Sequence, residues 1–533
     1  MGRAPQLPAS RVVLDPEAER AAAREALRLV AEELAQRAER AADPAARAIL
    51  EAQSLMAGDP MLTESCDELI AGGLDAAHAV HAAFTEQAEG LRAAGGYLGE
   101  RAADLEDLRD RAVARLLGEP MPGIPDPGHP FVLVADDLAP ADTAALDPAR
   151  VLALVTARGG PTSHTAILAR ALGLPAVVAC PGSASIEDGI LIHVDGAAGT
   201  VQLHVTAEHV AEVRERAAAD AAQAARGEEG ARGPGQTADG HRVPLMLNIG
   251  SADDLPADAA ENAEGVGLLR TELLFLGRHD APGLEEQREA YARVFAALPG
   301  RRVVLRTLDA GADKPLPFLS LAEEPNPALG IRGLRTARAR PEVLETQLAA
   351  VALAAADTAA EVWVMAPMVS TAGEAAEFAA RVRAHGLAKV GAMVEVPAAA
   401  LRAGQVLEHV DFLSIGTNDL GQYTMATDRQ CGELADLLDP WQPALLDLIA
   451  ACAAAGRAAG KPVGVCGEAA SDPLLACVLV GLGISSLSMS QGAVGRVNAQ
   501  LRRRTRDECA RLAEAVLAAP DAAAARAAAE SAG

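Results

Sequence analysis

Eight short runs rich in Val, Ile and Leu recur between residues 244 and 489, and amphipathic helical segments alternate with them. The runs cover residues 244–249, 265–270, 302–307, 362–368, 389–395, 410–416, 462–466 and 485–489. Strands that alternate with helices form parallel sheets, because each crossover between parallel strands needs a connection as long as a helix. Eight such units in roughly 250 residues match a (β/α)8 barrel. We therefore predict that residues 241–533 contain such a barrel.

The residues before the barrel predict two further regions. Residues 15–117 place Leu and Ala at three- and four-residue spacing between Glu and Arg, a pattern typical of antiparallel helical hairpins. This region is either a plain structural bundle or a docking platform. A Pro- and Gly-rich stretch at 120–130 separates it from a compact α/β unit.

Strands are expected in the α/β unit at 130–135, 151–156, 176–178 and 190–194. A charged helix and a flexible Gly-rich stretch follow that unit. The predicted organisation is a helical region at 1–119, an α/β unit at 120–206, a linker helix and hinge at 207–240, and the barrel at 241–533.

Charge and cysteine usage exclude several classes of protein. The net charge of −26 argues against binding to nucleic acid or to anionic membranes. The seven cysteines are scattered without a CxxC pair, so neither a disulfide framework nor a zinc site is expected, and a reducing cytoplasm is the predicted location. No signal peptide and no apolar run long enough for a membrane span is visible.

One histidine lies in a setting suited to carrying a phosphoryl group. The apolar run 151–155 leads into a Gly-Gly turn at 159–160, and a helix is expected to begin at Thr162 or Ser163. His164 would then lie in the first turn, where free backbone N–H groups and the helix dipole favour a phosphate. The hydroxyls on either side can fix the ring tautomer and leave one nitrogen free as a nucleophile. The alternative is an ordinary histidine at the start of a helix.

Polar and charged residues close five of the eight predicted barrel strands. They are Arg270, Arg306, Glu395, Asn418 with Asp419, and Cys466. The carboxyl ends of all strands in such a barrel meet at one rim, and the chemistry of this fold collects there. A single charged strand end would be an ordinary helix cap or surface charge. The convergence of five strand ends on one rim predicts a functional site.

The histidine segment and several barrel segments resemble one family. The run Gly-Gly-Pro-Thr-Ser-His-Thr-Ala at 159–166 closely resembles the phosphohistidine signature of enzymes that exchange phosphate with phosphoenolpyruvate. That family includes enzyme I of the sugar phosphotransferase system, phosphoenolpyruvate synthase and pyruvate phosphate dikinase. The segments 267–272, 414–424 and 465–468 resemble the phosphoenolpyruvate-binding domain of the same family. The implied fold is multidomain, with an α-helical carrier-docking bundle, a swivelling α/β phosphohistidine domain and a C-terminal (β/α)8 TIM-type barrel.

The resemblance implies a role for each matching residue. His164 is expected to be phosphorylated, and Cys466 to deliver a proton to the methylene carbon of enolpyruvate, with a buried inert cysteine as the alternative. Substrate binding is expected from Arg270, Arg306, Asn418, Asp419 and Arg429, and metal binding from Glu395 and Asp419. Guanidinium forks suit the phosphate and the carboxylate of phosphoenolpyruvate. Mg²⁺ is the expected cofactor, because one or two carboxylates with substrate oxygens are its usual ligands.

Two further cationic residues are expected near the substrate. Arg332, at the end of the run Asn-Pro-Ala-Leu-Gly-Ile-Arg, is predicted as an additional guanidinium fork. Lys314 could add a point charge to the same site. A salt bridge from Lys314 to Asp313 or Asp309 is an equally good interpretation of that lysine.

Among these relatives, the predicted order of domains resembles enzyme I. Only a helical stretch precedes the histidine unit, and it lacks the Gly-rich phosphate loop expected of the ATP-binding domain in the synthase or dikinase. One departure is that the chain starts without the Ala-Ser-Pro-Gly strand with which enzyme I normally opens. The family is homodimeric through its barrel, so a homodimer is also expected.

The expected function is transfer of the phosphoryl group of phosphoenolpyruvate, via His164, to the histidine carrier protein HPr. Pyruvate is released, and this transfer is the first step of phosphoenolpyruvate-dependent sugar uptake. Two alternatives stay open. One is an enzyme like phosphoenolpyruvate synthase or pyruvate phosphate dikinase, and the other is a non-catalytic regulator that senses phosphoenolpyruvate.

Overall fold

The computed structural model describes residues 15–40, 44–94, 102–119, 127–136, 146–158, 174–196, 199–206, 208–215, 233–256, 263–276, 280–311, 316–319, 324–429 and 431–531, with a few single residues between these ranges. The chain divides into two compact units. One comprises Met1–Glu212 with Arg429–Ala435, and the other comprises Val213–Asp428 with Asp436–Gly533. Separate clusters of buried apolar side chains hold the helical part, the small α/β part and the barrel.

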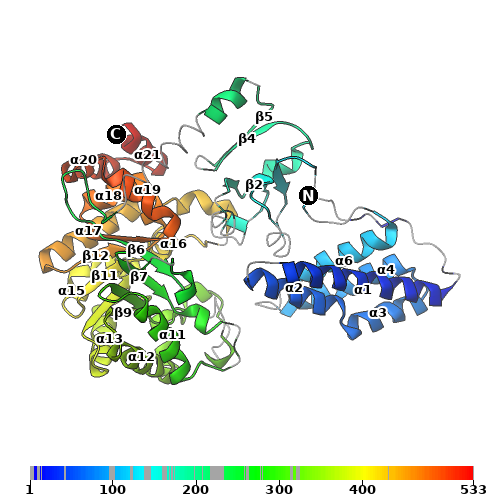
Figure 1. Cartoon of the computed structure of the whole chain (residues 1–533), viewed down its shortest axis with the longest axis horizontal. Helices are drawn as coiled ribbons and strands as arrows, with labels where there is room; N and C mark the ends of the chain where they lie inside the picture. Colours follow the sequence, from blue (N-terminus) through cyan, green and yellow to red (C-terminus); the bar gives the residue numbers. More distant parts are fainter. Residues whose placement is uncertain are drawn as a thin grey trace. The chain divides into compact units, whose positions relative to one another are not determined.

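The described part of residues 1–119 contains five helices (Figure 1). They are α1 (Pro16–Arg40), α2 (Pro44–Ala57), α3 (Pro60–Ala71), α4 (Ala76–Ala94) and α6 (Ala102–Leu117). Three of them begin at a proline, which suits the first helical position because its missing N–H needs no partner there. Leu27 and Leu34 of α1 belong to the same buried cluster as Ile70 of α3 and Phe84 of α4. The apolar spacing of the sequence therefore builds the core of the predicted helical part.

A three-stranded parallel sheet lies in the α/β part, in the order β1–β2–β3. Its strands are β1 (Phe131–Ala135), β2 (Val151–Thr156) and β3 (Ala176–Val177), and the short 3-10 helix η1 (Pro181–Ser185) follows. β4 (Ile192–Asp195) and β5 (Thr200–Leu203) form an antiparallel hairpin. The sequence pattern does not predict β5, because its residues are mostly exposed and show no buried face.

The second unit contains a closed barrel of eight parallel strands (Figure 1). In chain order they are β6 (Leu245–Ile249), β7 (Gly265–Arg270), β8 (Arg302–Arg306), β9 (Glu361–Ala366), β10 (Lys389–Val394), β11 (Phe412–Ile415), β12 (Val463–Val465) and β13 (Ser486–Met489). Each strand pairs with the next one, and β13 closes the barrel by pairing with β6. All eight predicted runs form strands, so the predicted (β/α)8 barrel is confirmed.

Helices connect and flank the barrel strands. They are α11 (Leu284–Ala296), α12 (Pro341–Ala356), α13 (Ala372–Ala384), α14 (Pro397–Leu401), α15 (Ala403–Leu407), α16 (Thr417–Met425), α17 (Pro443–Ala459), α18 (Pro473–Leu482), α19 (Gln491–Leu501), α20 (Arg506–Leu517) and α21 (Ala522–Ser531). α17 and α18 end at Gly460 (φ 63°) and Gly483 (φ 101°), left-handed positions at which glycine carries no steric penalty. In the described ranges, no helix is long and apolar enough to cross a membrane.

Hydrogen bonds to distant residues hold the last residues of the predicted hinge in place. Residues 233–240, which are predicted as part of the hinge, pack on the helices that follow the last strand. Asn498 Nδ2 donates to the carbonyl of Gly233 (3.1 Å), and the amide of Ala238 donates to the carbonyl of Arg504 (2.8 Å). These hydrogen bonds join residues more than 260 positions apart, so local composition alone cannot reveal them. The other predicted domain boundaries remain predictions.

Candidate functional site

Four of the predicted rim residues end or follow a barrel strand. Arg306 is the last residue of β8, Glu395 follows β10, Asp419 lies in the first turn of α16 after β11, and Cys466 follows β12. All four side chains are buried. Because the strands are parallel and the barrel is closed, these positions share one rim.

Arg306 is the centre of a buried ion-pair network. Its guanidinium nitrogens lie 3.1 Å from Glu272, 3.1 Å from Asp309 and 3.6 Å from Glu395, measured to carboxylate oxygens. Its Nη1 also lies 3.5 Å from the sulfur of Met393. Burial alone would lower the pKa of Arg306, but the charges of the three carboxylates raise it. Arg306 is therefore a permanent cation.

Arg332 forms a second cationic centre, and its side chain is fully buried. Its Nη1 and Nη2 donate to the two carboxylate oxygens of Asp419 at 3.0 and 3.2 Å, a bidentate pair. Its Nε and Nη2 donate to Asp309 at 3.2 and 3.1 Å. Nη1 also lies 3.4 Å from the hydroxyl of Tyr423, which donates to the carbonyl of Ala328. Arg332 thus joins the network of Arg306 through their common partner Asp309.

Among the described residues, the network holds more carboxyl groups than guanidinium groups. Two guanidinium groups face four carboxyl groups, those of Glu272, Asp309, Glu395 and Asp419. Burial, together with the charges of Asp419 and Asp309, raises the pKa of Glu395 to about 8. A divalent cation would offset this excess, and carboxylate oxygens are the ligands that Mg²⁺ prefers. Glu395 and Asp419 therefore fit the chemistry of Mg²⁺.

The described residues alone do not make a complete cage for a cation. Among them, no three His, Cys, Asp or Glu side chains converge closely enough to hold a metal ion. Mg²⁺ commonly takes one or two carboxylates and completes its octahedron with water and substrate oxygens. The arrangement is therefore that of a site shared between protein and ligand.

Backbone geometry fixes the position of Glu395. Its Oε2 accepts a hydrogen bond from the amide of Met368 at 2.8 Å. Met368 has a positive φ of 58°, a conformation that costs a non-glycine residue about 1–3 kcal/mol and is concentrated at functional sites. On the other side, a Cβ at Gly416 would lie 2.8 Å from Cγ of Glu395. A glycine is therefore needed at 416 for the carboxyl group to reach its place.

Cys466 is a buried thiol whose proton is held at neutral pH. Its Sγ lies 3.6 Å from the carbonyl of Ile415. Burial raises the pKa of the Cys466 thiol, while a hydrogen bond with Ser414 and the charges of Arg306 and Arg270 act in the opposite direction. A protonated thiol at the rim has the property that a general acid requires.

Three further predicted site residues, Arg270, Asn418 and Arg429, lie outside the buried ion-pair network. Arg270 ends β7 and is exposed, and its charge acts on the thiol of Cys466. The side-chain oxygen of Asn418 accepts a hydrogen bond from the amide of Glu468 at 3.1 Å. Arg429 begins the short segment Arg429–Ala435, which groups with the first unit. Its role in binding stays a prediction.

His164 and Lys314 both lie outside the described residues. Thr165 and Ala166, which directly follow the histidine, are helical. The proposed nucleophile and the proposed point charge therefore stay predictions from the sequence.

Three residues of the network were not among the predicted site residues. Asp309 bridges the two arginines, Glu272 pairs with Arg306, and Tyr423 contacts Arg332. A usable signal was present for two of them, because Glu272 and Asp309 each lie two or three residues after an arginine that ends a strand. For Tyr423 the signal is weaker, since a tyrosine within a helix has many possible roles.

Three family models match the chain. The N-terminal domain of PEP-utilising enzymes matches residues 2–101, their mobile domain matches residues 127–199, and their PEP-binding domain matches residues 224–506. The last of these matches spans the whole barrel and every described residue of the network.

Several relatives are similar over most of the chain. A phosphoenolpyruvate-protein phosphotransferase of Streptomyces coelicolor is 54% identical over 529 residues, which cover 99% of this chain and 94% of that protein. Another, of Haloferax volcanii, is 43% identical over 88% of this chain and 84% of that protein. A third, of Geobacillus stearothermophilus, is 41% identical over 79% of this chain and 75% of that protein.

Proposed function

The chain belongs to the PEP-utilising enzymes and, within them, to the phosphoenolpyruvate–protein phosphotransferases, and we propose that it passes a phosphoryl group from phosphoenolpyruvate through His164 to HPr. The observation that carries this proposal is the rim of the barrel. There, two buried arginines, four carboxyl groups and one protonated thiol meet. This set suits a substrate that brings a phosphate and a carboxylate and leaves a carbon that needs a proton.

Substrate binding would rearrange the charges of the rim. The phosphate and carboxylate of phosphoenolpyruvate are bound by the guanidinium groups of Arg270, Arg306, Arg332 and Arg429, with Asn418 and Lys314 as further contacts. In this structure, Nη1 and Nη2 of Arg332 donate hydrogen bonds to the carboxylate of Asp419. A substrate phosphate would replace that carboxylate and free Asp419 to act with Glu395 as a ligand of Mg²⁺. The bound cation would neutralise charge that develops on the phosphoryl and enolate oxygens.

The phosphoryl step is a displacement at phosphorus. A ring nitrogen of His164 attacks the phosphorus, the bond from phosphorus to the enol oxygen breaks, and the electron pair of that bond leaves with enolpyruvate. Arg306 and Arg332 hold the phosphoryl group in place and stabilise its negative charge, which is where most of the rate enhancement in such transfers arises. The products of this step are phosphohistidine and the enolate of pyruvate.

The proton step completes the reaction. The enolate is converted to pyruvate when its methylene carbon takes a proton, and the thiol of Cys466 supplies it. The raised pKa of the buried thiol keeps this proton available at neutral pH. Solvent would return the proton to the thiolate before the next turnover.

Transfer to HPr needs a docking surface and movement. We assign docking to the helices of residues 15–117, because their acidic composition suits a carrier with a basic rim. His164 must then reach both the rim and the carrier, so the α/β domain is proposed to swivel on hinges at its two ends. A homodimer formed through the barrel and a cytoplasmic location complete the proposal, the latter because seven free cysteines suit a reducing compartment.

The proposal is tested by labelling the protein with radioactive phosphoenolpyruvate in the presence of Mg²⁺. One histidine should carry the label, through a bond that is lost in acid and survives in alkali. His164→Ala should remove the label, whereas His193→Ala, on β4 of the same part of the chain, should retain it. Label that persists in His164→Ala would contradict the assignment. ATP-dependent phosphorylation of pyruvate would favour an enzyme like the synthase or dikinase instead.

A second experiment addresses docking. Deleting residues 15–117 should abolish transfer to HPr and leave phosphoenolpyruvate binding at the barrel intact. In the whole protein, association with HPr should weaken as salt increases, because surface charges are screened. A deleted protein that still phosphorylates HPr at a normal rate would contradict the docking assignment.

A further inference from the structure

The thiol of Cys466 faces the interior of the barrel, beneath the rim. Cys466 belongs to a cluster of buried side chains that includes Met393 of β10 and Phe412 of β11. Side chains two positions apart share one face of a strand, and Gly464 lines a space in the barrel interior. A thiol that has given up its proton therefore leaves a thiolate in largely apolar surroundings. Burial raises the pKa of this thiol, so the thiolate takes a proton at neutral pH once a donor is within reach.

Ser414 is a polar side chain beside this thiol. It lies on β11, where it pairs with Gly464 of β12, and its hydroxyl forms a hydrogen bond with the thiol. This hydrogen bond lowers the pKa of the thiol, because the hydroxyl donates and the sulfur accepts. The sulfur also lies 3.6 Å from the carbonyl oxygen of Ile415, which can accept the thiol proton. Ser414 is thus placed to hold the sulfur as a thiol and as a thiolate.

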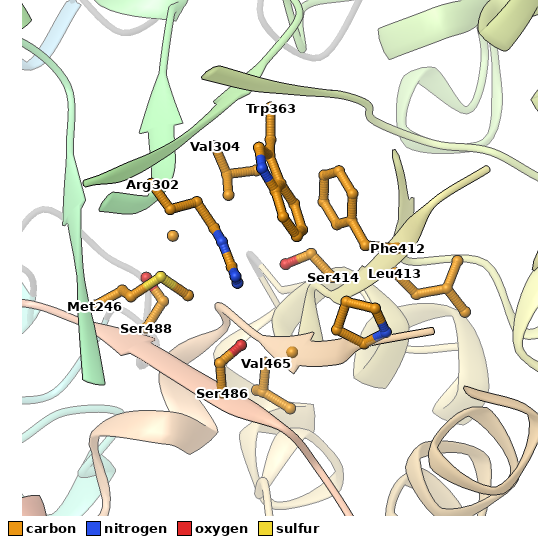
Figure 2. A pocket seen from close by; sticks show the side chains of 13 residues that line it. Met246, Arg302, Val304, Trp363, Phe412, Leu413, Ser414, Val465, Ser486 and Ser488 are labelled. Atoms are coloured by element: carbon orange, nitrogen blue, oxygen red, sulfur yellow. The ribbon is translucent and has the colours of Figure 1, made fainter. Parts of the chain in front are cut away.

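Ser414 also lines a small space in the barrel interior (Figure 2). The enclosed part of this space is about the size of one water molecule. Figure 2 shows the guanidinium of Arg302 and the hydroxyl of Ser486 beside it. Nε of Arg302 is buried and has no hydrogen-bond partner among the described residues. Buried polar groups of this kind are commonly satisfied by ordered water, which makes about two to four hydrogen bonds.

The space lies at the amino ends of the strands, opposite to the rim. Among its lining residues, Arg302 and Ser486 are the first residues of their strands, and Pro462 directly precedes β12. Arg302, Pro462 and Gly464 are only half-buried. Water can therefore enter the space from the end of the barrel that does not carry the rim.

We propose that Ser414 is a positioning residue for Cys466 that returns a proton to its sulfur from water in this space. The inference rests on the proposed function, because it concerns the thiol that donates to enolpyruvate. The S–H bond of Cys466 re-forms with the hydroxyl proton of Ser414, Ser414 takes a proton from the water, and solvent at the amino end replaces that proton. One proton enters for each pyruvate formed, and no electrons are transferred.

This route supplies protons from a side that a bound substrate does not cover. A substrate at the rim lies beyond the ends of the strands, on the side of Arg306 and Glu395. Ser414 lies within β11 and approaches the thiol from the barrel interior. The thiol can therefore regain its proton while the rim is occupied.

Isotope exchange between pyruvate, phosphoenolpyruvate and solvent tests this route without HPr. The full-length protein is incubated in heavy water with Mg²⁺, phosphoenolpyruvate and pyruvate that carries radioactive carbon. Radioactive carbon in phosphoenolpyruvate measures how often the reaction runs in both directions. Deuterium in the methyl group of pyruvate, followed by NMR, measures how often the thiol exchanges its proton with solvent. The ratio of the two exchanges reports on proton return, because a thiol that does not exchange gives back the proton it took.

The variants separate the hydroxyl of Ser414 from the space beside it. Ser414→Ala should lower the ratio of deuterium to carbon exchange by about tenfold or more. Ser414→Thr keeps a hydroxyl and should restore the wild-type ratio. Ser486→Val keeps Ser414 but fills the space with methyl groups, so it should lower the ratio as well. Ser485→Ala is the matched control, since it removes a hydroxyl bonded to Val463 at the start of β12, and it should leave the ratio unchanged.

The outcomes distinguish this route from a purely structural role of the serine. An unchanged ratio in Ser414→Ala, whatever its overall rate, would overturn the inference, and so would a ratio in Ser414→Thr as low as that in Ser414→Ala. Should Ser414→Ala not fold, Ser486→Val decides, and a wild-type ratio there overturns the route. Absence of carbon exchange in the wild-type protein would instead contradict the proposed function, and the inference with it.

Discussion

The two ends of strand β8 place an arginine in opposite surroundings. Arg306, at the carboxyl end, lies within 3.6 Å of three carboxylates. Arg302, at the amino end, faces an indole ring, and no ion pair to it exists among the described residues. The two arginines are the first and last residues of β8, four positions apart, so their side chains leave the same face of the strand. The two residues are of the same type, so the difference between the two ends of the barrel comes from the side chains that surround each arginine.

The comparison shows how charge balance separates the two ends. At the rim, the described carboxyl groups outnumber the guanidinium groups, and this balance suits the proposed binding of a cation together with an anionic substrate. At the opposite end, the guanidinium of Arg302 stacks on Trp363 and has no ionic partner among the described residues. Equivalent substitutions at the two ends should therefore have unequal consequences for activity and stability.

The largest effect should come from Cys466, the proposed proton donor at the rim. Cys466→Ala should lower steady-state pyruvate formation by about 10²- to 10⁴-fold, the usual contribution of a positioned acid. Phosphoenolpyruvate should still bind, and one turnover of phosphohistidine should still form, because the substitution touches no phosphate contact. Rapid quench and steady-state assays measure the two steps separately. Cys452→Ala, another buried cysteine of the barrel unit, is the control and should turn over normally. A wild-type rate in Cys466→Ala would move the acid elsewhere.

The next largest effect should come from the cation at the centre of the rim. Arg306→Met leaves three carboxylates without their common partner, and removing one member of a buried ion pair typically costs about 3–5 kcal/mol. Phosphohistidine formation should also fall by about 10²-fold or more. Denaturant unfolding followed by tryptophan emission reports on the barrel, since both tryptophans lie there. A loss below about 1 kcal/mol would show that the network stabilises little.

A smaller effect should appear as a dependence on pH. Because the pKa of Glu395 is raised to about 8 in the folded protein, against an ordinary value of 4.5, the folded state keeps a proton that the unfolded state has lost between these pH values. Stability of the metal-free protein should therefore fall as pH rises from 4.5 to 8, by a few kcal/mol in total from this group. Glu395→Gln should lack this component. Unfolding free energies of both proteins measured at several pH values test it, and parallel profiles would contradict it.

The smallest effect should come from the other end of β8. Arg302→Met loses the stacking on Trp363, worth about 0.5–2 kcal/mol, but also removes a charge that is buried without an ionic partner. The two terms oppose each other, so stability should change by less than about 1 kcal/mol. The same unfolding assay applied to Arg302→Met and Arg306→Met compares the two ends directly. Equal losses of unfolding free energy in the two variants would contradict the difference between the two ends of β8.

The barrel could be predicted from the sequence because each strand leaves a local signal. β8, for example, is a short apolar run between two arginines, and its burial on both faces needs no knowledge of its neighbours. β5 leaves no such signal, since its residues are mostly exposed and pair with β4 through the backbone and one contact between the side chains of Gln202 and His193. The segment 233–240 is similar, because its Gly-rich composition is that of a loop and distant helices hold it in place.

Part of the site could also be predicted from a local signal in the sequence. Position at a strand end identifies Arg306, Glu395 and Cys466. It does not show which of these side chains pair with one another, because the amide of Asp309 donates to Glu272 across 37 residues and this contact depends on the closed barrel.

Closure of the barrel through β13 and β6 has a consequence for biosynthesis. The hydroxyl of Ser488 donates to the carbonyl of Leu247 across 241 residues, so this seam forms only when the last strand has been made. At the usual rate of about 5–20 residues per second, β6 waits roughly 10–50 s on the ribosome with an unpaired edge, and such edges invite aggregation. The rim draws on strands from β8 to β12, so catalytic competence arrives late in synthesis. A nascent chain therefore completes its N-terminal helices well before it completes the rim of its barrel.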